Sequence, residues 1–163
     1  NNMDEYMDIE TTGLSPFSDS ITVIGIYLVK GGDNRLLQLV GHEVTEENIL
    51  NALRGVGIIF TYNGRRFDLP FIHACIGVDL TLSHRHHDLM YDCWRNNLYG
   101  GFKAVEQQLC IGRKLKGIDG FEAVRLWWRY KNAGDQKALA LLLQYNAEDV
   151  VNLKVLREKL AVR

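Results

Sequence analysis

The chain has 163 residues, enough for one domain with a single hydrophobic core. Hydrophobic residues make up 47% and charged residues 24%, as in ordinary globular proteins, and no apolar run approaches the ~18 residues of a membrane span. The formal net charge of −1 excludes the strongly positive surface that holds long duplexes by counterion release. Any nucleic acid would therefore bind at a local site.

Cysteine usage and the first residues bear on location and domain boundaries. The three cysteines (Cys75, Cys93 and Cys110) form no CxxC pair and are odd in number, which favours reduced thiols and a cytoplasmic location. The sequence opens with Asn1 and Asn2 and has no initiator methionine, so we expect a domain of a longer protein. Residues 1–163 are predicted to form a single domain.

The first predicted strand ends in an acidic motif, DIETTGL, which begins at Asp8. Side chains alternate along a strand, so Asp8 and Glu10 point the same way while Met7 and Ile9 face the opposite side. Two like charges so close repel each other unless something positive lies between them, and a divalent metal is the obvious candidate. The alternative for such a pair is a solvated strand face.

The next elements indicate an α/β chain. Strands are predicted at 21–29 and at about 35–42, joined by a glycine-rich turn, so that the first three strands form an antiparallel meander. A helix is expected to begin near Thr45, whose side chain can cap it, and to end at Gly55. The apolar run 57–63 then fits a buried parallel strand. Together these elements predict a mixed central sheet flanked by helices.

A second motif, YNGRRFDLPF, leaves this strand and enters a helix near Asp68. The Asp68 carboxylate would lie at the carboxyl end of a strand, where open α/β sheets bind their ligands. One short strand is predicted within 79–98, a region that contains His84, His86 and His87. These histidines lack a partner pair at zinc-site spacing, so a solvated loop or a substrate contact is favoured over a metal site.

Two helices are predicted next, at about 102–109 and 121–130. The second carries Trp127, Trp128 and Tyr130, which are expected to be core or interface anchors more than a platform for stacking bases.

The final helix is predicted from about 135 to 160. Its apolar positions fall within a narrow arc at 3.6 residues per turn. Tyr145 and Asp149 are four residues apart and share this arc, so Asp149 should face the sheet and need a partner there. Asn146 could instead cap a new helix, which leaves open whether the helix is continuous.

Four carboxylates thus become candidates for one site: Asp8, Glu10, Asp68 and Asp149. Oxygen ligands of this kind suit Mg²⁺ or Mn²⁺. Two such ions, about 3.5 to 4 Å apart, would supply the attacking nucleophile and stabilise the leaving oxygen in phosphodiester hydrolysis.

The three motifs, in this order, resemble those of the DEDD superfamily of 3′-to-5′ exonucleases, the DnaQ-like enzymes with an RNase H-like fold. DIETTGL resembles the first motif. YNGRRFDLPF resembles the second, with its asparagine five residues before the aspartate as in proofreading domains of family B polymerases. YNAED is similar to the third motif in its tyrosine form, YxxxD, which defines the DEDDy subgroup. The spacing of the later helices is most similar to YprB-type RNase H-like domains.

The resemblance implies a role for each motif residue. Asp8, Glu10 and Asp149 would bind the metal that activates water, Asp8 would bridge to a second ion held by Asp68, and Tyr145 would orient the nucleophile. Contacts to the last nucleotides are implied for four further residues, with Leu14 wedged against the terminal base and Phe67 stacked on a base: Thr11, Leu14, Asn63 and Phe67.

The function implied is a metal-dependent 3′-to-5′ exonuclease that acts on the 3′ ends of single-stranded DNA or RNA, in replication, DNA repair or RNA processing, with further domains or partners. An endonuclease of the RNase H or resolvase kind should lack YxxxD. A non-catalytic binding domain would be expected to have lost a ligand. The basic residues near the second motif and in the later loop could be exposed charge or phosphate contacts: Arg65, Arg66, Arg113, Lys114 and Lys116.

Overall fold

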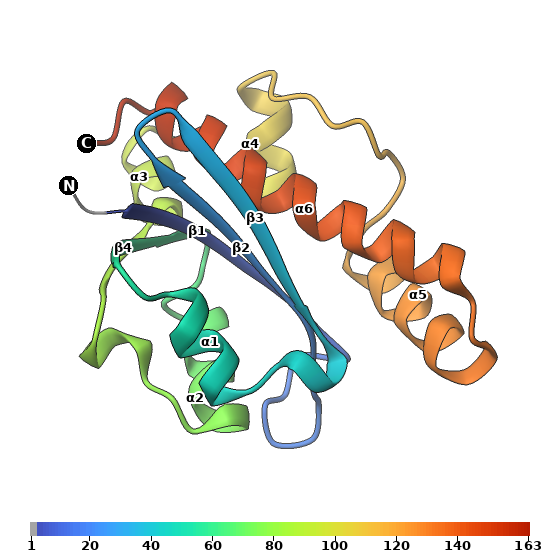
Figure 1. Ribbon diagram of the computed structural model, residues 1–163. Coiled ribbons are helices and arrows are strands. Elements are labelled where there is room, and N and C mark those ends of the chain that lie inside the picture. Colours follow the sequence, from blue (N-terminus) through green and yellow to red (C-terminus); the bar gives the residue numbers. More distant parts are fainter. Residues whose placement is uncertain (1–2) are drawn as a thin grey trace.

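The computed structural model describes residues 3–163, so Asn1 and Asn2, on which the expectation of a preceding segment rests, lie outside it. Five strands form one sheet in the order β3-β2-β1-β4-β5 (Figure 1). Their bounds are β1 (Met3–Thr11), β2 (Ile21–Lys30), β3 (Asp33–Val40), β4 (Val56–Thr61) and β5 (Arg85–Asp88). β1, β2 and β3 pair antiparallel, whereas β4 pairs parallel with β1 and β5. The predicted mixed α/β sheet is confirmed.

Within residues 3–163, six α-helices and two short 3-10 helices flank the sheet. Their bounds are α1 (Glu46–Ala52), α2 (Asp68–Ile76), α3 (Leu89–Arg95), α4 (Phe102–Gln108), α5 (Gly120–Ala133), α6 (Gln136–Lys159), η1 (Gly41–Glu43) and η2 (Leu80–Leu82). The side chains of Thr45, Asp88, Asp119 and Asp135 cap α1, α3, α5 and α6. None of the helices in the described part of the chain is long and apolar enough to cross a membrane.

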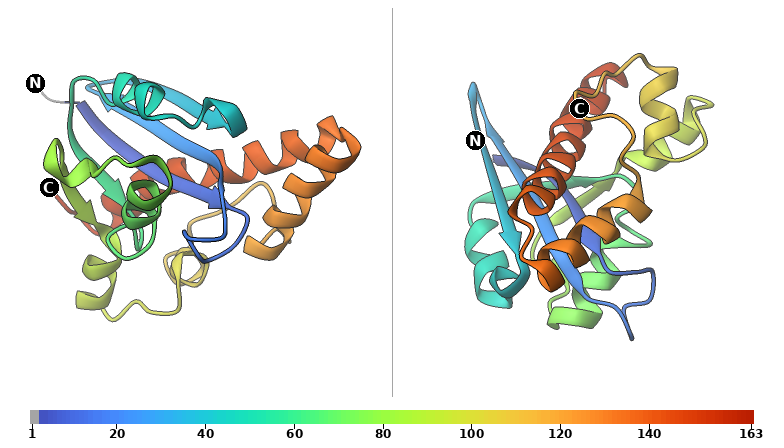
Figure 2. Two further views of the ribbon diagram at one scale, coloured as in Figure 1. Left: turned by 90° about the horizontal axis from the view of Figure 1, so that it is seen from below. Right: turned by 90° about the vertical axis from the view of Figure 1, so that its right-hand side faces the viewer.

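The two faces of β1 pack against different helices. Met7 and Ile9 join the core cluster that contains Ile49 of α1 and Phe71 of α2. Tyr6, on the alternate face, packs with the core residues of α3, α4 and α6. Strand alternation therefore places Asp8 and Glu10 opposite Met7 and Ile9, as predicted, and on the face that packs against α6. α5 and α6 run side by side as a hairpin that extends past the end of the sheet (Figure 2).

α6 is one continuous helix, so the alternative of a new helix start at Asn146 is wrong. The buried Asn146 side chain bonds to the sheet and not to its own backbone: Nδ2 donates to the Asp8 carbonyl at 3.2 Å, and Oδ1 accepts from Gln38 Nε2 at 3.0 Å. Gly25 permits this close approach, because a Cβ on that residue would lie 2.3 Å from Asn146 Oδ1. Asn146 thus seats α6 on the strand that carries the acids.

Two local predictions need correction. The third strand ends at Val40 and not at His42, because Gly41 has φ +56° and begins η1. The region of His86 and His87 is not a solvated loop, since Arg85–Asp88 form β5. The single short strand predicted within 79–98 is therefore confirmed, and it contains His86 and His87.

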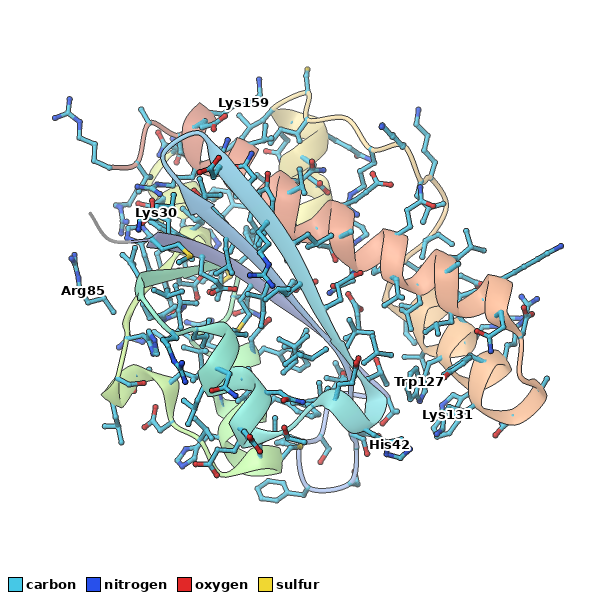
Figure 3. The ribbon with its side chains drawn as sticks, in the orientation of Figure 1. Lys30, His42, Arg85, Trp127, Lys131 and Lys159 are labelled. Carbon is cyan, nitrogen blue, oxygen red and sulfur yellow. The ribbon has the colours of Figure 1, made fainter. Side chains whose placement is uncertain are left out.

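Trp127 is a core residue, as expected. It is buried between α5 and η1, and its ring would lie 3.3 Å from a Cβ placed on Gly41 (Figure 3). Lys131, one turn later on α5, places its ammonium 5.7 Å from the Trp127 ring centre. Trp128 differs, because its side chain is 44% exposed. Trp127 is therefore the α5 aromatic that fixes the helix against the end of the sheet.

Glu5 lies on the same face of β1 as Met7 and Ile9 and is fully buried. Neither of its carboxyl oxygens has a hydrogen-bond partner among the described residues. Burial, together with the nearby Asp68 charge, raises the pKa of Glu5 well above its usual value. Glu5 therefore holds its proton to a higher pH than an exposed glutamate does.

This burial predicts a pH-dependent effect of Glu5→Gln. The unfolded chain releases the Glu5 proton near the ordinary pKa of about 4.3, whereas the folded chain retains it to higher pH. The unfolded state then binds fewer protons, so the parent loses unfolding free energy as pH rises. In urea unfolding, we compare the unfolding free energies of Glu5→Gln and the parent. The difference should favour the variant by at least about 1 kcal/mol more at pH 8 than at pH 5. Glu47→Gln, which changes an exposed acid on α1, is the control. A difference between Glu5→Gln and the parent that is the same at pH 5 and pH 8 would contradict the prediction.

Candidate active site

Three acids from two elements converge on one point. β1 supplies Asp8 and Glu10, α6 supplies Asp149, and one carboxylate oxygen from each lies within 4.8 Å of the others. Within residues 3–163 this is the one group of three or more acidic, histidine or cysteine side chains with such spacing. Three of the four predicted acids are thus brought together.

Asp68, the fourth predicted acid, lies beside this group and not inside it. It is the first residue of α2, and its Oδ2 accepts a hydrogen bond from the Ile9 amide at 3.1 Å. Ile9 lies between Asp8 and Glu10 in sequence, so Asp68 is held against the acidic end of β1. Burial raises the pKa of Asp68 to about 7, although the Ile9 hydrogen bond opposes the shift.

The crowded acids hold protons strongly. Burial, then the charges of Asp149 and Glu10, raise the pKa of Asp8 well above its usual value. Burial and Asp149 raise the pKa of Glu10 to about 8. A divalent cation would relieve this repulsion, and a set of carboxylate oxygens is the donor chemistry that Mg²⁺ and Mn²⁺ prefer. The residues present therefore fit such an ion.

The acids open into a pocket of about 200 Å³. It is lined by Asp8, Ile9, Glu10, Tyr62, Phe102, Lys103, Tyr145, Asp149 and Leu153. Tyr62 and Phe102 stack with ring centres 5.2 Å apart, and Lys103 Nζ lies 4.5 Å from the Tyr145 ring centre. The pocket is thus lined by aromatic side chains and one lysine in addition to the three acids.

Tyr145 lies one helical turn before Asp149 and is buried, as the sequence predicts. Burial, followed by the charges of Asp149, Glu10 and Asp8, raises the pKa of Tyr145 above its usual value. The side chain is therefore a neutral phenol across the physiological range. It can donate a hydrogen bond in this pocket and is unsuited to accept a proton.

Four residues at the site were not predicted to be there. Tyr62, Phe102 and Lys103 line the pocket, and Arg113 hydrogen-bonds Asp149 through Nη2. Of the two alternatives for Arg113, exposed charge is wrong, because its side chain is only 12% exposed. Tyr62 directly precedes the asparagine of the second motif, which was a usable signal. The other three carry no motif.

None of the four predicted substrate contacts lines the pocket. Thr11 Oγ1 donates to the Gly13 carbonyl at 2.6 Å, and Leu14 is 85% exposed in the loop after β1. Asn63 adopts φ +62° and donates its backbone N–H to an Asp88 carboxylate oxygen, and the Phe67 ring packs 5.4 Å from that of Phe71.

The three clustered histidines each bond a different group. The ring of His84 hydrogen-bonds the Leu53 carbonyl, that of His86 bonds Thr61 Oγ1 at 2.8 Å, and that of His87 pairs with Asp92. Burial lowers the pKa of His86, which therefore stays neutral at physiological pH. Within residues 3–163 none of the three belongs to a group of side chains spaced to hold one ion.

Comparisons with known proteins place the chain in a family. The family model described as the RNase_H superfamily matches residues 5–161, so the chain belongs to this superfamily. Its mixed sheet and flanking helices form an RNase H-like α/β fold. No curated protein matches the chain significantly in a sequence search.

Solved structures share the fold. The family B DNA polymerase of the archaeon Pyrobaculum calidifontis superposes with a TM-score of 0.75 at 16% identity, over 99% of this chain and 25% of the polymerase. Brucella melitensis NrnC with bound Mg²⁺ gives 0.65 at 21% identity, over 98% of this chain and 72% of NrnC. A structure of exonuclease I gives 0.52 at 17% identity, over 100% of this chain and 41% of that enzyme. The chain thus spans only a quarter of the polymerase. At these low sequence identities, the similarity to the three structures is one of fold.

Proposed function

We propose that this domain is a 3′-to-5′ exonuclease of the DEDDy subgroup, of the YprB type, which hydrolyses phosphodiester bonds at the 3′ ends of single-stranded nucleic acid. The observation that carries the proposal is the convergence of Asp8, Glu10 and Asp149 in one pocket, with Tyr145 one turn from Asp149. A solvated surface pair would not bury its carboxylates or raise the pKa of Glu10 to about 8.

The position of each residue suggests its role in the proposed reaction. Asp8, Glu10 and Asp149 would hold one divalent cation, and Asp68, fixed by the Ile9 amide, would hold a second. The bound cations supply an activated nucleophile and stabilisation of the leaving oxygen. Tyr145 donates a hydrogen bond that orients the attacking water.

The size of the pocket limits what enters it. A volume of about 200 Å³ is below the range of about 300 Å³ upward that encloses a drug-sized ligand. The pocket suits ions and one phosphate, and we expect the terminal base to lie outside it, in contact with Leu14, which is exposed. Tyr62 and Phe102 form an aromatic wall on which a base can stack irrespective of sequence.

Two of the neighbouring structures support the proposal by what was bound to them. One NrnC structure contains Mg²⁺ and another contains pGG. The ion agrees with the all-oxygen donor set of Asp8, Glu10 and Asp149. A short oligonucleotide agrees with a small pocket and with a chain that has no large positive field.

A free 3′ end should be essential. Linear single-stranded DNA and RNA of matched sequence, labelled at the 5′ end, should shorten to small products with Mn²⁺ or Mg²⁺ and remain intact with a chelator. Circular single-stranded DNA should survive the same conditions, because a small pocket that takes a terminal phosphate gives no path to an internal one. Asp149→Asn is the matched control for contaminating nucleases. Cleavage of the circle by the parent would favour an endonuclease, and the ratio of DNA to RNA rates would define the substrate.

A further inference from the structure

Arg113 bonds two buried carboxylates, Glu106 and Asp149, beside the pocket. Its Nε donates to both oxygens of Glu106, at 2.8 and 3.0 Å, and its Nη2 donates to Asp149 Oδ1. The set of hydrogen bonds is not complete, because Nη1 is buried and has no hydrogen-bond partner among the described residues. Burial by itself would lower the pKa of Arg113, but Asp149 and Glu106 outweigh it and raise the pKa, so the guanidinium stays charged.

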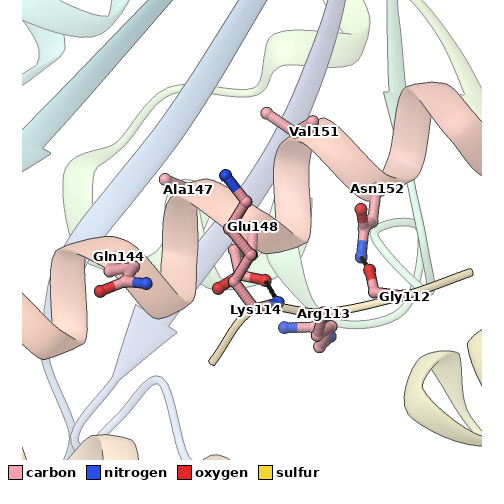
Figure 4. Close-up of a pocket in the computed structure, with 8 residues that line it drawn as sticks. All are labelled: Gly112, Arg113, Lys114, Gln144, Ala147, Glu148, Val151 and Asn152. Carbon is pink, nitrogen blue, oxygen red and sulfur yellow. Dashed lines mark hydrogen bonds between the residues drawn. The ribbon is translucent and has the colours of Figure 1, made fainter. Parts of the chain in front are cut away.

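The loop that carries Arg113 is fastened to α6 on both sides of it (Figure 4). Asn152 Nδ2 donates to the Gly112 carbonyl at 3.3 Å and to Glu106 at 2.6 Å. Glu148 accepts the backbone N–H groups of Lys114 and Leu115, each at 2.8 Å. The guanidinium is therefore held in place by a fixed backbone and not by a mobile loop.

Asp149 is the carboxylate that both Arg113 and a divalent cation would bind. Asp149 Oδ1 binds Arg113 directly, while the next cation, Lys103, lies 3.9 Å away on a more exposed side chain. Asp149 is also one of the three acids whose oxygens converge. A divalent cation at that point and the Arg113 guanidinium are both positive and both bind Asp149, so each opposes the other.

We propose that Arg113 is a positioning residue that competes with the divalent cation for Asp149. Without the ion, Arg113 neutralises Asp149 and holds it in the binding rotamer. When the ion binds, Nη2 gives up Asp149 Oδ1 while Nε keeps Glu106, so the guanidinium remains beside the pocket. The inference rests on the metal role in the proposed function and adds a built-in limit on metal affinity.

Metal titration separates competition from a merely structural role. Chelator-stripped protein is titrated with MnCl₂ by calorimetry at pH 8.5. Arg113→Met, which keeps length and removes charge, should bind Mn²⁺ at least about tenfold more tightly than the parent. Arg113→Lys, which keeps the charge and loses the guanidinium fork, should fall between them. Equal or weaker binding by Arg113→Met would overturn the proposal.

Two further variants serve as controls for the metal titration. Arg129→Met removes a comparable arginine–aspartate pair, Arg129 with Asp135 at 3.0 Å, on the exposed α5–α6 turn, and should leave Mn²⁺ affinity unchanged. A tightening there as well would overturn the assignment to Arg113. If Arg113→Met does not fold because Glu106 is left uncompensated, the double variant Glu106→Gln/Arg113→Met removes both charges and should still bind more tightly than Glu106→Gln alone.

The parent protein offers a direct readout. The Nε–H resonance of Arg113, identified by its loss in Arg113→Lys, should shift when MgCl₂ saturates the site, because the neighbouring Nη2 leaves Asp149. An unmoved resonance at saturation would overturn the competition while leaving metal binding itself intact. Failure of the parent to bind either ion would overturn both this inference and the proposed function, so the two failures are distinguishable.

Discussion

Asp8→Asn should abolish hydrolysis and leave the protein folded. Asp8 is one of the three converging acids that would hold a divalent cation, so its loss removes a ligand that no other described side chain can replace. Its carboxylate does not hold the fold together, because burial and its acidic neighbours already raise its pKa. The α6 contact at this position uses the Asp8 backbone carbonyl, which asparagine retains.

The measurement is turnover of an end-labelled single strand at saturating Mn²⁺, with thermal unfolding of the same samples. The variant should unfold at or above the temperature of the parent, since an amide removes the repulsion among the acids. Asp19→Asn, in the loop after β1, is a control that changes an acid outside the pocket. Turnover by Asp8→Asn within threefold of the parent would refute its role as a metal ligand.

Local periodicity accounts for the part of the site that the sequence predicts. Alternation along β1 separates Asp8 and Glu10 from Met7 and Ile9, and a spacing of four puts Tyr145 above Asp149. The same alternation assigns Glu5 to the apolar face, so a buried acid could have been predicted from the strand pattern alone.

Contacts between distant segments account for what the sequence does not predict. Arg113 lies 36 residues from Asp149, in a loop with no periodic pattern, and only the packing of that loop on α6 turns it inward. Asn146 shows the opposite case, a local preference overruled by tertiary structure. Asparagine favours helix starts, yet its hydrogen bonds to Gln38 and to the Asp8 carbonyl keep it inside a continuous helix.

Tyr145→Phe should slow hydrolysis on the order of 10²-fold without abolishing it, because one positioned hydrogen bond is lost while every carboxylate remains. Asp149→Asn removes a converging acid and should be inactive, so the two variants should differ clearly. Removing the hydroxyl leaves the buried ring in place, along with its contact to Lys103 at 4.5 Å. The loss should therefore appear in the rate of the chemical step and not in folding or in substrate binding.

The pH profile tests how Tyr145 acts. Burial and then the acids raise the pKa of its phenol above the usual value, so it donates throughout the neutral range and does not titrate there. The rate of the parent should rise with pH, and Tyr145→Phe should follow the same profile at a lower level, with no step near ~6.5 that the substitution removes. Single-turnover measurements at saturating Mn²⁺ isolate the chemical step. A variant as fast as the parent under these conditions would make Tyr145 a core residue only and would remove the ground for the DEDDy assignment.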